Sequence, residues 1–405
     1  MRNYSFEDFV GDPGGFLTES FNKKPAYYPG QMTGKLEDLP GIDVLDDLLA
    51  LEAVSPSYLR VTKNGQSVPR HTYTRVTGDR AALSDAVVPE RVFELFRTGG
   101  TVTWNSLEHI LPHTRRLLDP FARTFASRTD LVLFVTPAGH EGFRPHHDSV
   151  DVYVLQLAGT KRWRVWETPE GRQAQMGSDD AEELGEPLLT TTLRPGDVLY
   201  VPYGTPHAAA AEDSISVHLS IGVVPRHWSD LIRESVIAIT GSEEFGEFPL
   251  LAPGYEDDAR KKLAVLLARV RELLASLDAD VELDRLADAG RREGELTGFR
   301  EFERLSVIDR LTGDSVLTRS SLEIELGDSD GKKTTIGANG IKIAIPNAMA
   351  RLLSESRPGA QLSAGSLLPG APRARSVIAA QRLARLGVLD VAAIGSAQVA
   401  DDTPA

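Results

Sequence analysis

The stretches GFRPHHD (142–148) and GDVLYVPYGTPH (196–207) decide the fold. The first places a histidine and an aspartate two residues apart, with a further histidine between them. On an extended strand, side chains two residues apart point to the same side, so His146 and Asp148 face one way while His147 points away. The chain can therefore present one imidazole and one carboxylate together on a single face of a strand.

The second stretch follows the spacing G-x5-P-x-G-x2-H. Gly196 turns the chain into a strand, Pro202 ends that strand, and Gly204 permits the tight turn that presents His207 inward. With the histidine and aspartate of the first stretch, His207 completes two imidazoles and one carboxylate on one face of an ion. This is the facial triad of non-haem Fe(II) oxygenases, which leaves positions open for a bidentate co-substrate and for O₂.

Six short apolar, β-branched runs surround these stretches between residues 131 and 223, separated by Gly, Pro and Asp: LVLFVT, VDVYVLQL, KRWRVW, PLLTTTL, VLYVP and SISVHLSIGV. Such a series predicts an antiparallel barrel or sandwich. Before it, residues 102–127 carry leucine and isoleucine at three- and four-residue intervals, which predicts a helix. His218, in the last run, is expected to be a core histidine or a partner of a ligand rather than a fourth ligand.

The strand GTKRWRV (159–165) supplies a candidate binding group for the co-substrate. Lys161 and Trp163 share one face of that strand. A dicarboxylate that chelates the metal through one end needs a positive partner for its distal carboxylate, and an unpaired buried charge costs about 3–5 kcal/mol. We therefore predict that Lys161 projects into the barrel and binds that carboxylate.

Composition narrows the class of protein. The formal net charge is -14, which argues against general attraction to nucleic acid. The chain has no cysteine, so thiolate metal sites and disulfides are excluded. The N-terminal residues lack a secretory signal pattern, and no run approaches the roughly 18 apolar residues of a membrane span. A cytoplasmic protein without a membrane partner is expected.

The rest of the chain changes character twice. Leucines and Val270 recur at helical spacing between residues 263 and 277, and packing within the chain or against a second subunit explains them equally well. From about residue 300, two alternating stretches predict strands, Pro346 begins a predicted helix, and a last helix covers about 375–386. Residues 301–405 hold 12 Lys or Arg and 12 Asp or Glu, a balance that argues against DNA binding.

Residues 100–223 resemble the JmjC-type cupin oxygenases of the ribosomal-oxygenase branch (cupin superfamily 4). The resemblance rests on TPAGHEGFRPHHDSVDVYVLQLAGTKRWRVW (136–166) and LRPGDVLYVPYGTPHAAA (193–210). It implies a mixed α+β fold: a double-stranded β-helix (cupin or jelly-roll) barrel with N-terminal helices, a helical dimerisation segment and a C-terminal winged-helix-like domain. The expected divisions are residues 1–226, 227–300 and 301–395, followed by a flexible tail at 396–405.

The resemblance also implies Fe(II)- and 2-oxoglutarate-dependent hydroxylation, using O₂, of a protein or peptide side chain, with a ribosomal protein as one candidate target. His146, Asp148 and His207 would be both metal ligands and catalytic residues, and Lys161 would bind 2-oxoglutarate. Several members carry Asn-x-Tyr on the strand before the first ligand, where this chain has Val132 and Phe134. The polar contacts to 2-oxoglutarate are then expected to shift to other hydroxyl groups: Ser149, Ser220 or Thr136.

Three other functions stay open at the level of sequence. The same chemistry could act on a specialised metabolite. A cupin isomerase or decarboxylase would use a divalent metal without 2-oxoglutarate, and succinate release dependent on 2-oxoglutarate separates it from an oxygenase. A non-catalytic binding protein would keep the barrel without binding any metal.

Overall fold

The computed structural model describes residues 4–51, 55–78, 85–172, 175–250, 252–293, 301–320, 322, 324–338, 341–357 and 359–394. The chain forms two compact units, residues 1–297 and 298–405, and each is considered by itself. The predicted division at residue 226 stays a prediction, and the predicted tail at 396–405 lies outside the described residues.

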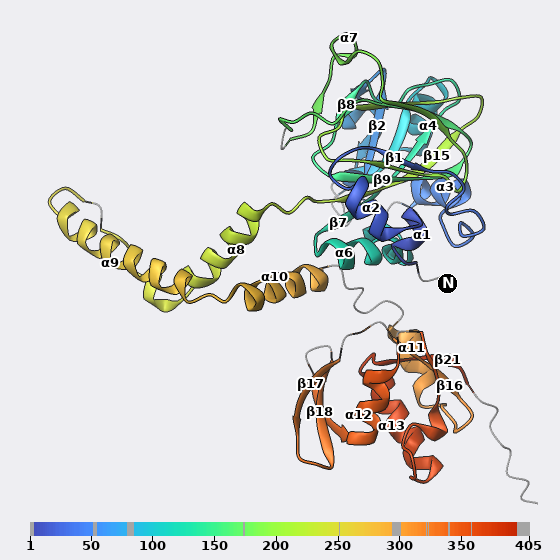
Figure 1. Cartoon of the computed structure of the whole chain (residues 1–405). Helices are drawn as coiled ribbons and strands as arrows, with labels where there is room; N and C mark the ends of the chain where they lie inside the picture. Colours follow the sequence, from blue (N-terminus) through green and yellow to red (C-terminus); the bar gives the residue numbers. More distant parts are fainter. Residues whose placement is uncertain are drawn as a thin grey trace, which may run out of the picture. The chain divides into compact units, whose positions relative to one another are not determined.

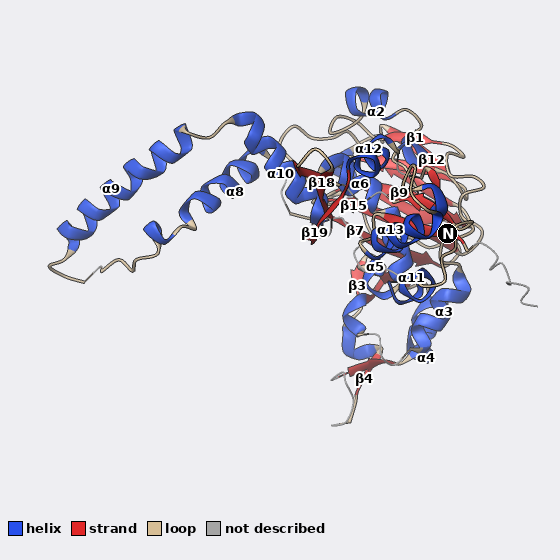
Figure 2. Ribbon diagram, turned by 90° about the horizontal axis from the view of Figure 1, so that it is seen from below, coloured by secondary structure: helices blue, strands red, loops and turns tan. Residues whose placement is uncertain are grey.

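The first unit is built on two antiparallel sheets (Figures 1 and 2). The larger has the strand order β1-β13-β9-β15-β7-β6-β2-β3, and the smaller has the order β11-β8-β14-β10-β12. Their bounds are β1 (Ala26–Tyr28), β2 (Leu59–Lys63), β3 (Gln66–Ser67), β6 (Thr101–Trp104), β7 (Thr129–Thr136), β8 (His146–His147), β9 (Asp151–Ala158), β10 (Lys161–Val165), β11 (Gly177–Ser178), β12 (Leu189–Leu193), β13 (Val198–Val201), β14 (His207–Ala211) and β15 (Ser216–Val223).

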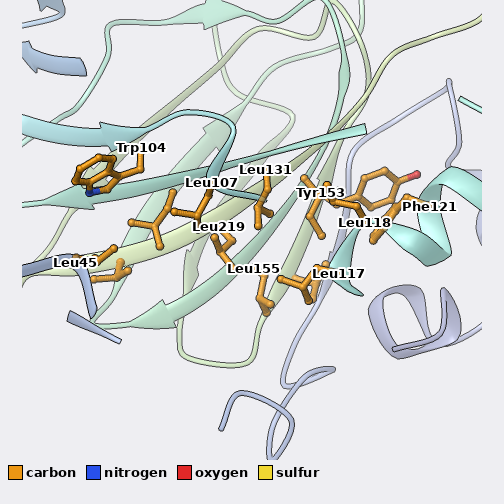
Figure 3. Close-up of a cluster of buried hydrophobic side chains, with 14 of the residues drawn as sticks. Leu45, Trp104, Leu107, Leu117, Leu118, Phe121, Leu131, Tyr153, Leu155 and Leu219 are labelled. Atoms are coloured by element: carbon orange, nitrogen blue, oxygen red, sulfur yellow. The ribbon is translucent and has the colours of Figure 1, made fainter. Parts of the chain in front are cut away.

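All six predicted strands are confirmed, as β7, β9, β10, β12, β13 and β15. Their side-chain alternation explains the architecture. On β9, Val152 and Val154 pack inside the barrel with Trp163 of the smaller sheet. Tyr153 and Leu155 point to the opposite face and join the main hydrophobic core (Figure 3). The larger sheet is therefore covered on both faces, which is why β9 is apolar along almost its whole length.

Short helices from the N-terminal part of the chain complete that core. Phe6 and Phe16 pack edge-on against each other. Phe6, Phe16 and Phe121 all contact the ring of Tyr153. The helices are α1 (Glu7–Val10), α2 (Pro13–Glu19), α3 (Ile42–Ala50), α4 (Pro89–Arg97), α5 (Leu107–Ile110) and α6 (Asp119–Phe125), with α7 (Ala181–Leu184) in a barrel loop and a short two-stranded sheet of β4 (Thr74–Val76) and β5 (Asp85–Val87).

The single helix predicted at residues 102–127 is wrong. Residues 101–104 form strand β6, which pairs with β2 and β7. The rest divides into α5, a 3-10 helix (Pro112–Leu117) and α6. Pro112 and Pro120 explain the division, because proline lacks the N–H that a continuous helix needs and clashes with the preceding turn. The leucines nevertheless reach the core, as the periodicity indicated: Leu107, Leu117 and Leu118 are buried (Figure 3).

Helices α8 (Trp228–Thr240), α9 (Glu256–Ala275) and α10 (Ala279–Glu293) follow the barrel. Helix α8 packs on α9, and α10 packs on α6. Arg226 anchors the start of this segment, donating hydrogen bonds to the carbonyls of Ala126 and Leu286. In the part of the chain that the structure describes, no helix has both the length and the apolar character needed to cross a bilayer.

The second unit has two three-stranded sheets around three helices (Figure 1). Helix α13 ends two residues before Gly387, close to the predicted end, and Pro346 closes a strand and caps the predicted helix after it. Four strands, β16, β18, β20 and β21, were not predicted. The elements are α11 (Glu301–Ile308), β16 (Val316–Arg319), β17 (Glu325–Ser329), β18 (Lys333–Ala338), β19 (Ile341–Pro346), α12 (Asn347–Glu355), β20 (Gln361–Ser363), α13 (Arg373–Arg385) and β21 (Leu389–Ala393).

Candidate metal centre and the buried lysine

Strand β14 lies between β8 and β10 in the smaller sheet, and its register brings the predicted residues together. His207 on β14 is directly opposite His146 on β8. Side chains of opposed residues on antiparallel strands lie on the same face and are close neighbours. Asp148 follows His146 by two residues and turns to the same side, whereas His147 points away and binds Asp179 through Nδ1 at 2.9 Å.

The three side chains form a compact cluster. One ligand atom from each of His146, Asp148 and His207 lies within 4.8 Å of the others. The two imidazole ring centroids are 4.4 Å apart, and Nε2 of His207 is 3.5 Å from Oδ2 of Asp148. Two imidazoles and a carboxylate at these separations match the donor set of a facial triad.

Both imidazoles are oriented by main-chain carbonyls. Nδ1 of His146 is 2.9 Å from the carbonyl oxygen of Arg144, and Nδ1 of His207 is 2.9 Å from that of Thr205. A carbonyl can only accept a hydrogen bond, so each Nδ1 carries the proton. The lone pair of each neutral ring is then on Nε2, which is the state that a metal ligand requires.

Electrostatics couple the three groups. Burial lowers the pKa of His146 to about 4, and the neighbouring His207 adds to this shift. Burial alone would raise the pKa of Asp148, but the hydrogen bond and charge of His207 lower it below its ordinary value. Burial would also lower the pKa of His207, yet Asp148 raises it. The carboxylate and the two imidazoles therefore form a cluster whose electrostatics favour a positive charge.

Two glycines flank strand β13, and the second is in the turn before His207. Gly196 has φ +93°, and a Cβ there would lie 2.9 Å from the backbone nitrogen of Thr33. Gly204 has φ +69°, and its N–H donates to the carbonyl of Asp148 at 2.9 Å. Both conformations belong to the left-handed region that favours glycine. The hydrogen bond from Gly204 therefore joins the turn that precedes His207 to the backbone of Asp148.

Lys161 is buried at the start of β10, opposite Ala211 of β14. Its Nζ donates a 3.0 Å hydrogen bond to Oγ1 of Thr136, which also accepts from Thr101. No carboxylate among the described residues pairs with it, and burial lowers its pKa to about 7. Lys161 therefore presents a desolvated ammonium group with no opposite charge to the same cavity as the metal cluster.

The remaining cavity wall is mostly apolar. Phe134 stacks face to face on His218, with centroids 4.6 Å apart, and Trp163 stacks over His207. His218 is buried as predicted, and burial together with the charge of Lys161 holds its pKa well below the ordinary value. Nδ1 of His218 and Nε1 of Trp163 have no hydrogen-bond partner among the described residues.

Of the hydroxyl groups predicted for co-substrate binding, Ser220 lines the cavity and Thr136 holds Lys161. Ser149 lies in the turn after β8 and does not line the cavity. Phe143 and Val152 line it but were not singled out from the sequence. Val152 could have been found, because it lies on the same face of its strand as Val154, whereas Phe143 sits in an irregular loop that carries no periodic signal.

Comparison with known proteins agrees with this geometry. Residues 107–231 match the family model described as the JmjC domain. This segment is a JmjC domain. The resemblance predicted from the two motifs is thereby confirmed. The segment includes the three residues of the metal cluster and the buried lysine.

The chain is similar to ribosomal oxygenase 1 of Rattus norvegicus, with 30% identity over 233 residues, which cover 53% of this chain and 39% of that protein. It is also similar to the bifunctional lysine-specific demethylase and histidyl-hydroxylase NO66 of Dictyostelium discoideum, with 32% identity over 150 residues, which cover 36% and 29%. The chain thus spans less than half the length of these relatives. YcfD, a ribosomal oxygenase from Escherichia coli, is similar in structure with 18% identity, a TM-score of 0.49 and coverage of 94% and 98%.

Replacing one histidine of the JmjC domain while keeping its neighbour tests the metal centre. We expect His146→Ala to lower the affinity for Co²⁺ by at least about 100-fold, because it removes a ligand that the backbone has already oriented. The measurement is equilibrium dialysis or the visible absorption of bound Co²⁺. His147→Ala is the matched control, since it removes an imidazole that points away from the cluster. Equal losses in the two folded variants would contradict the assignment.

Proposed function

We propose that the JmjC domain is an Fe(II)- and 2-oxoglutarate-dependent oxygenase that hydroxylates a side chain of a protein or peptide. The observation that carries this proposal is the buried ammonium group of Lys161, which has no counter-charge and faces the same cavity as His146, Asp148 and His207. A metal cupin that acts without a dicarboxylate would have no need for that charge. An anionic co-substrate explains it.

In this proposal each residue has a defined task. His146, Asp148 and His207 hold Fe(II), and Lys161 binds the distal carboxylate of 2-oxoglutarate. Iron and 2-oxoglutarate, when bound, supply the oxidising chemistry with O₂ and release succinate and CO₂. The apolar side chains of Phe134 and Trp163 exclude water from the cavity, and a low local dielectric strengthens the attraction between Lys161 and a carboxylate.

The charge of the chain favours a basic polypeptide as the substrate. Residues 301–405 hold equal numbers of basic and acidic residues, so the whole formal charge of -14 belongs to residues 1–300. An acidic catalytic unit attracts cationic peptides and speeds their encounter. Ribosomal proteins are basic, and two of the similar proteins are named ribosomal oxygenases. We therefore place ribosomal-protein peptides first among candidate substrates. We also propose the cytoplasm as the compartment.

We also propose that residues 227–300 form a homodimer interface and that the second unit is a winged-helix-like domain. Support for the dimer comes from apolar side chains on α8 and α9 that the chain itself leaves exposed, among them Ile232 (61%), Leu263 (56%) and Leu267 (49%). Leu263 and Leu267 are four residues apart and share one helix face. The β18–β19 hairpin beside α13 supports the winged-helix assignment.

The activity test is release of succinate by purified protein supplied with Fe(II), ascorbate, 2-oxoglutarate and ribosomal-protein peptides. We expect formation of succinate to depend on 2-oxoglutarate and one oxygen atom to appear on a peptide by mass spectrometry. Asp148→Ala should lower the rate by at least about 100-fold with the fold retained, because a ligand is lost. Asp213→Ala, which removes an exposed carboxylate before β15, should leave the rate unchanged. Undiminished succinate formation by Asp148→Ala would refute the proposal.

Lys161 predicts how binding of 2-oxoglutarate depends on pH. The co-substrate keeps its two negative charges between pH 6 and 9, whereas Lys161 loses its proton near pH 7. Affinity measured calorimetrically on Mn²⁺-loaded protein should therefore be constant below pH 7 and fall about tenfold per pH unit above it. Lys161→Arg is the matched control, because its guanidinium stays charged and the slope should disappear. A sloping profile for Lys161→Arg would show that another group titrates.

The same lysine predicts an effect on stability. The unfolded chain keeps this proton up to about pH 10.5 and the folded chain only to about 7, so folding is disfavoured by the charge below pH 7 and recovers as pH rises towards 10.5. We expect Lys161→Met to raise the free energy of unfolding at pH 6.5 by about 2 kcal/mol, while 2-oxoglutarate binding is lost. Tryptophan fluorescence measures this in residues 1–297, where all four tryptophans lie. A less stable Lys161→Met protein would contradict the unpaired charge.

The dimer is tested by light scattering after size-exclusion chromatography. We expect the unaltered chain to have twice the monomer mass, and Leu263→Asp/Leu267→Asp to have the monomer mass, since buried carboxylates oppose association. Leu326→Asp, at an exposed leucine of β17 in the second unit, should remain dimeric. A monomeric unaltered chain would refute the dimer.

A further inference from the structure

The second unit contains an open groove of about 550 Å³ between helix α13 and the strand β19 with the start of α12. Its floor is aliphatic: Ile343, Met349 and Leu383 line it, and Ile378 remains 53% exposed. The charged side chains that line the groove are all basic: Lys333, Arg375, Arg382 and Arg385. No acidic side chain from the described residues lines the groove.

The basic and apolar residues of α13 follow the helix period along one wall. Arg375, Ile378, Arg382 and Leu386 recur at intervals of three or four residues, which places them on one face of the helix. Arg375 and Arg382 are two turns apart, which corresponds to about 10 Å along the helix axis. The cations therefore form a row along the groove rather than a single point.

Three of the four cations form no salt bridge with the described residues of the unit. Arg385 forms an ion pair with Asp309. Arg375, Arg382 and Lys333 are exposed and form no salt bridge within the described part of the chain. The residues from 301 onward carry no net charge, so the groove is a local concentration of cations in a neutral unit. A ligand that carries both negative charges and apolar side chains would complement this patch and the apolar floor beside it.

We propose that this groove binds an acidic peptide segment of a partner protein, with aliphatic side chains on the floor and carboxylates against Arg375, Arg382 and Lys333. Helix-in-groove recognition uses this combination of apolar anchors and flanking charges. The site is separate from the JmjC domain, and its occupant has the charge opposite to that proposed for the substrate. It would recruit a partner rather than present a side chain for hydroxylation.

The lining distinguishes this ligand from two others. A phosphate backbone would use the cations but would leave Ile343, Met349 and Ile378 against polar surface, where their burial contributes nothing. A small anion could meet one cation but not two that are about 10 Å apart along a helix. A peptide that carries leucines between carboxylates satisfies the floor and the row of cations together.

The test uses the full-length chain and a fluorescein-labelled synthetic peptide of about twelve residues, long enough as a helix to span the groove at 1.5 Å per residue. The peptide has leucines at helical spacing with glutamates between them. We expect saturable binding in fluorescence anisotropy that weakens at high salt. Arg375→Glu/Arg382→Glu should weaken it by at least about tenfold, and Ile378→Asp should also weaken it.

Matched controls separate the groove from general charge effects. Arg351→Glu changes an exposed arginine of α12 that does not line the groove, and it should bind the peptide as the unaltered chain does. Peptides with serine for leucine, or lysine for glutamate, should bind at least about tenfold more weakly. The proposal is overturned by no binding to the unaltered chain, by equal effects of Arg351→Glu and the double variant, by equal binding of the serine peptide, or by tighter binding of an oligonucleotide. A change of oligomeric mass in the double variant would instead assign the groove to a second copy.

Discussion

The register of β14 is the constraint on which the site depends. This strand pairs with β8 on one side and β10 on the other, so that His207 is opposite His146 and Val165 at once, while Ala211 is opposite Lys161. A slip of one residue would turn His207 outward and separate the ligands, because successive side chains on a strand point to opposite faces. The hydrogen bond from Gly204 to Asp148 holds that register from outside the sheet.

The sequence revealed the site more completely than its surroundings, for physical reasons. The clustering of His146, Asp148 and His207 was predictable because their spacing encodes strand geometry, and the six apolar strands were predictable because their apolar residues alternate. Strands β8 and β14 lie outside the six apolar runs and were expected only from the spacing of the motif residues. The first has two residues, and the second is polar at its start and then small, as in HAAAA. The prediction of one helix at 102–127 was wrong because the leucine periodicity continues across Pro112 and Pro120. Proline lacks the N–H that a helix needs, so the helix is interrupted at both residues although the apolar pattern is not.

Phe134 shows why a divergent cavity wall can still hold a charged lysine. Nζ of Lys161 lies over the Phe134 ring, 5.9 Å from its centroid. The negative face of an aromatic ring attracts a cation by about 0.5–2 kcal/mol. The ring also stacks on the neutral imidazole of His218, which fixes its orientation. Phe134 therefore supports the ammonium group by its π face, without an oxygen atom.

The contacts of Lys161 do not fully offset the free-energy cost of burying its charge. An uncompensated buried charge costs about 3–5 kcal/mol, more than one cation–π contact and the single hydrogen bond to Thr136 return. The remainder appears as the low pKa of Lys161, about 7. A carboxylate that bound to the lysine would offset this cost. The free energy that the buried charge takes from folding would then contribute to the affinity for an anion. An apolar residue at position 161 would give a more stable barrel, so the lysine costs stability that the proposed binding of a carboxylate would offset.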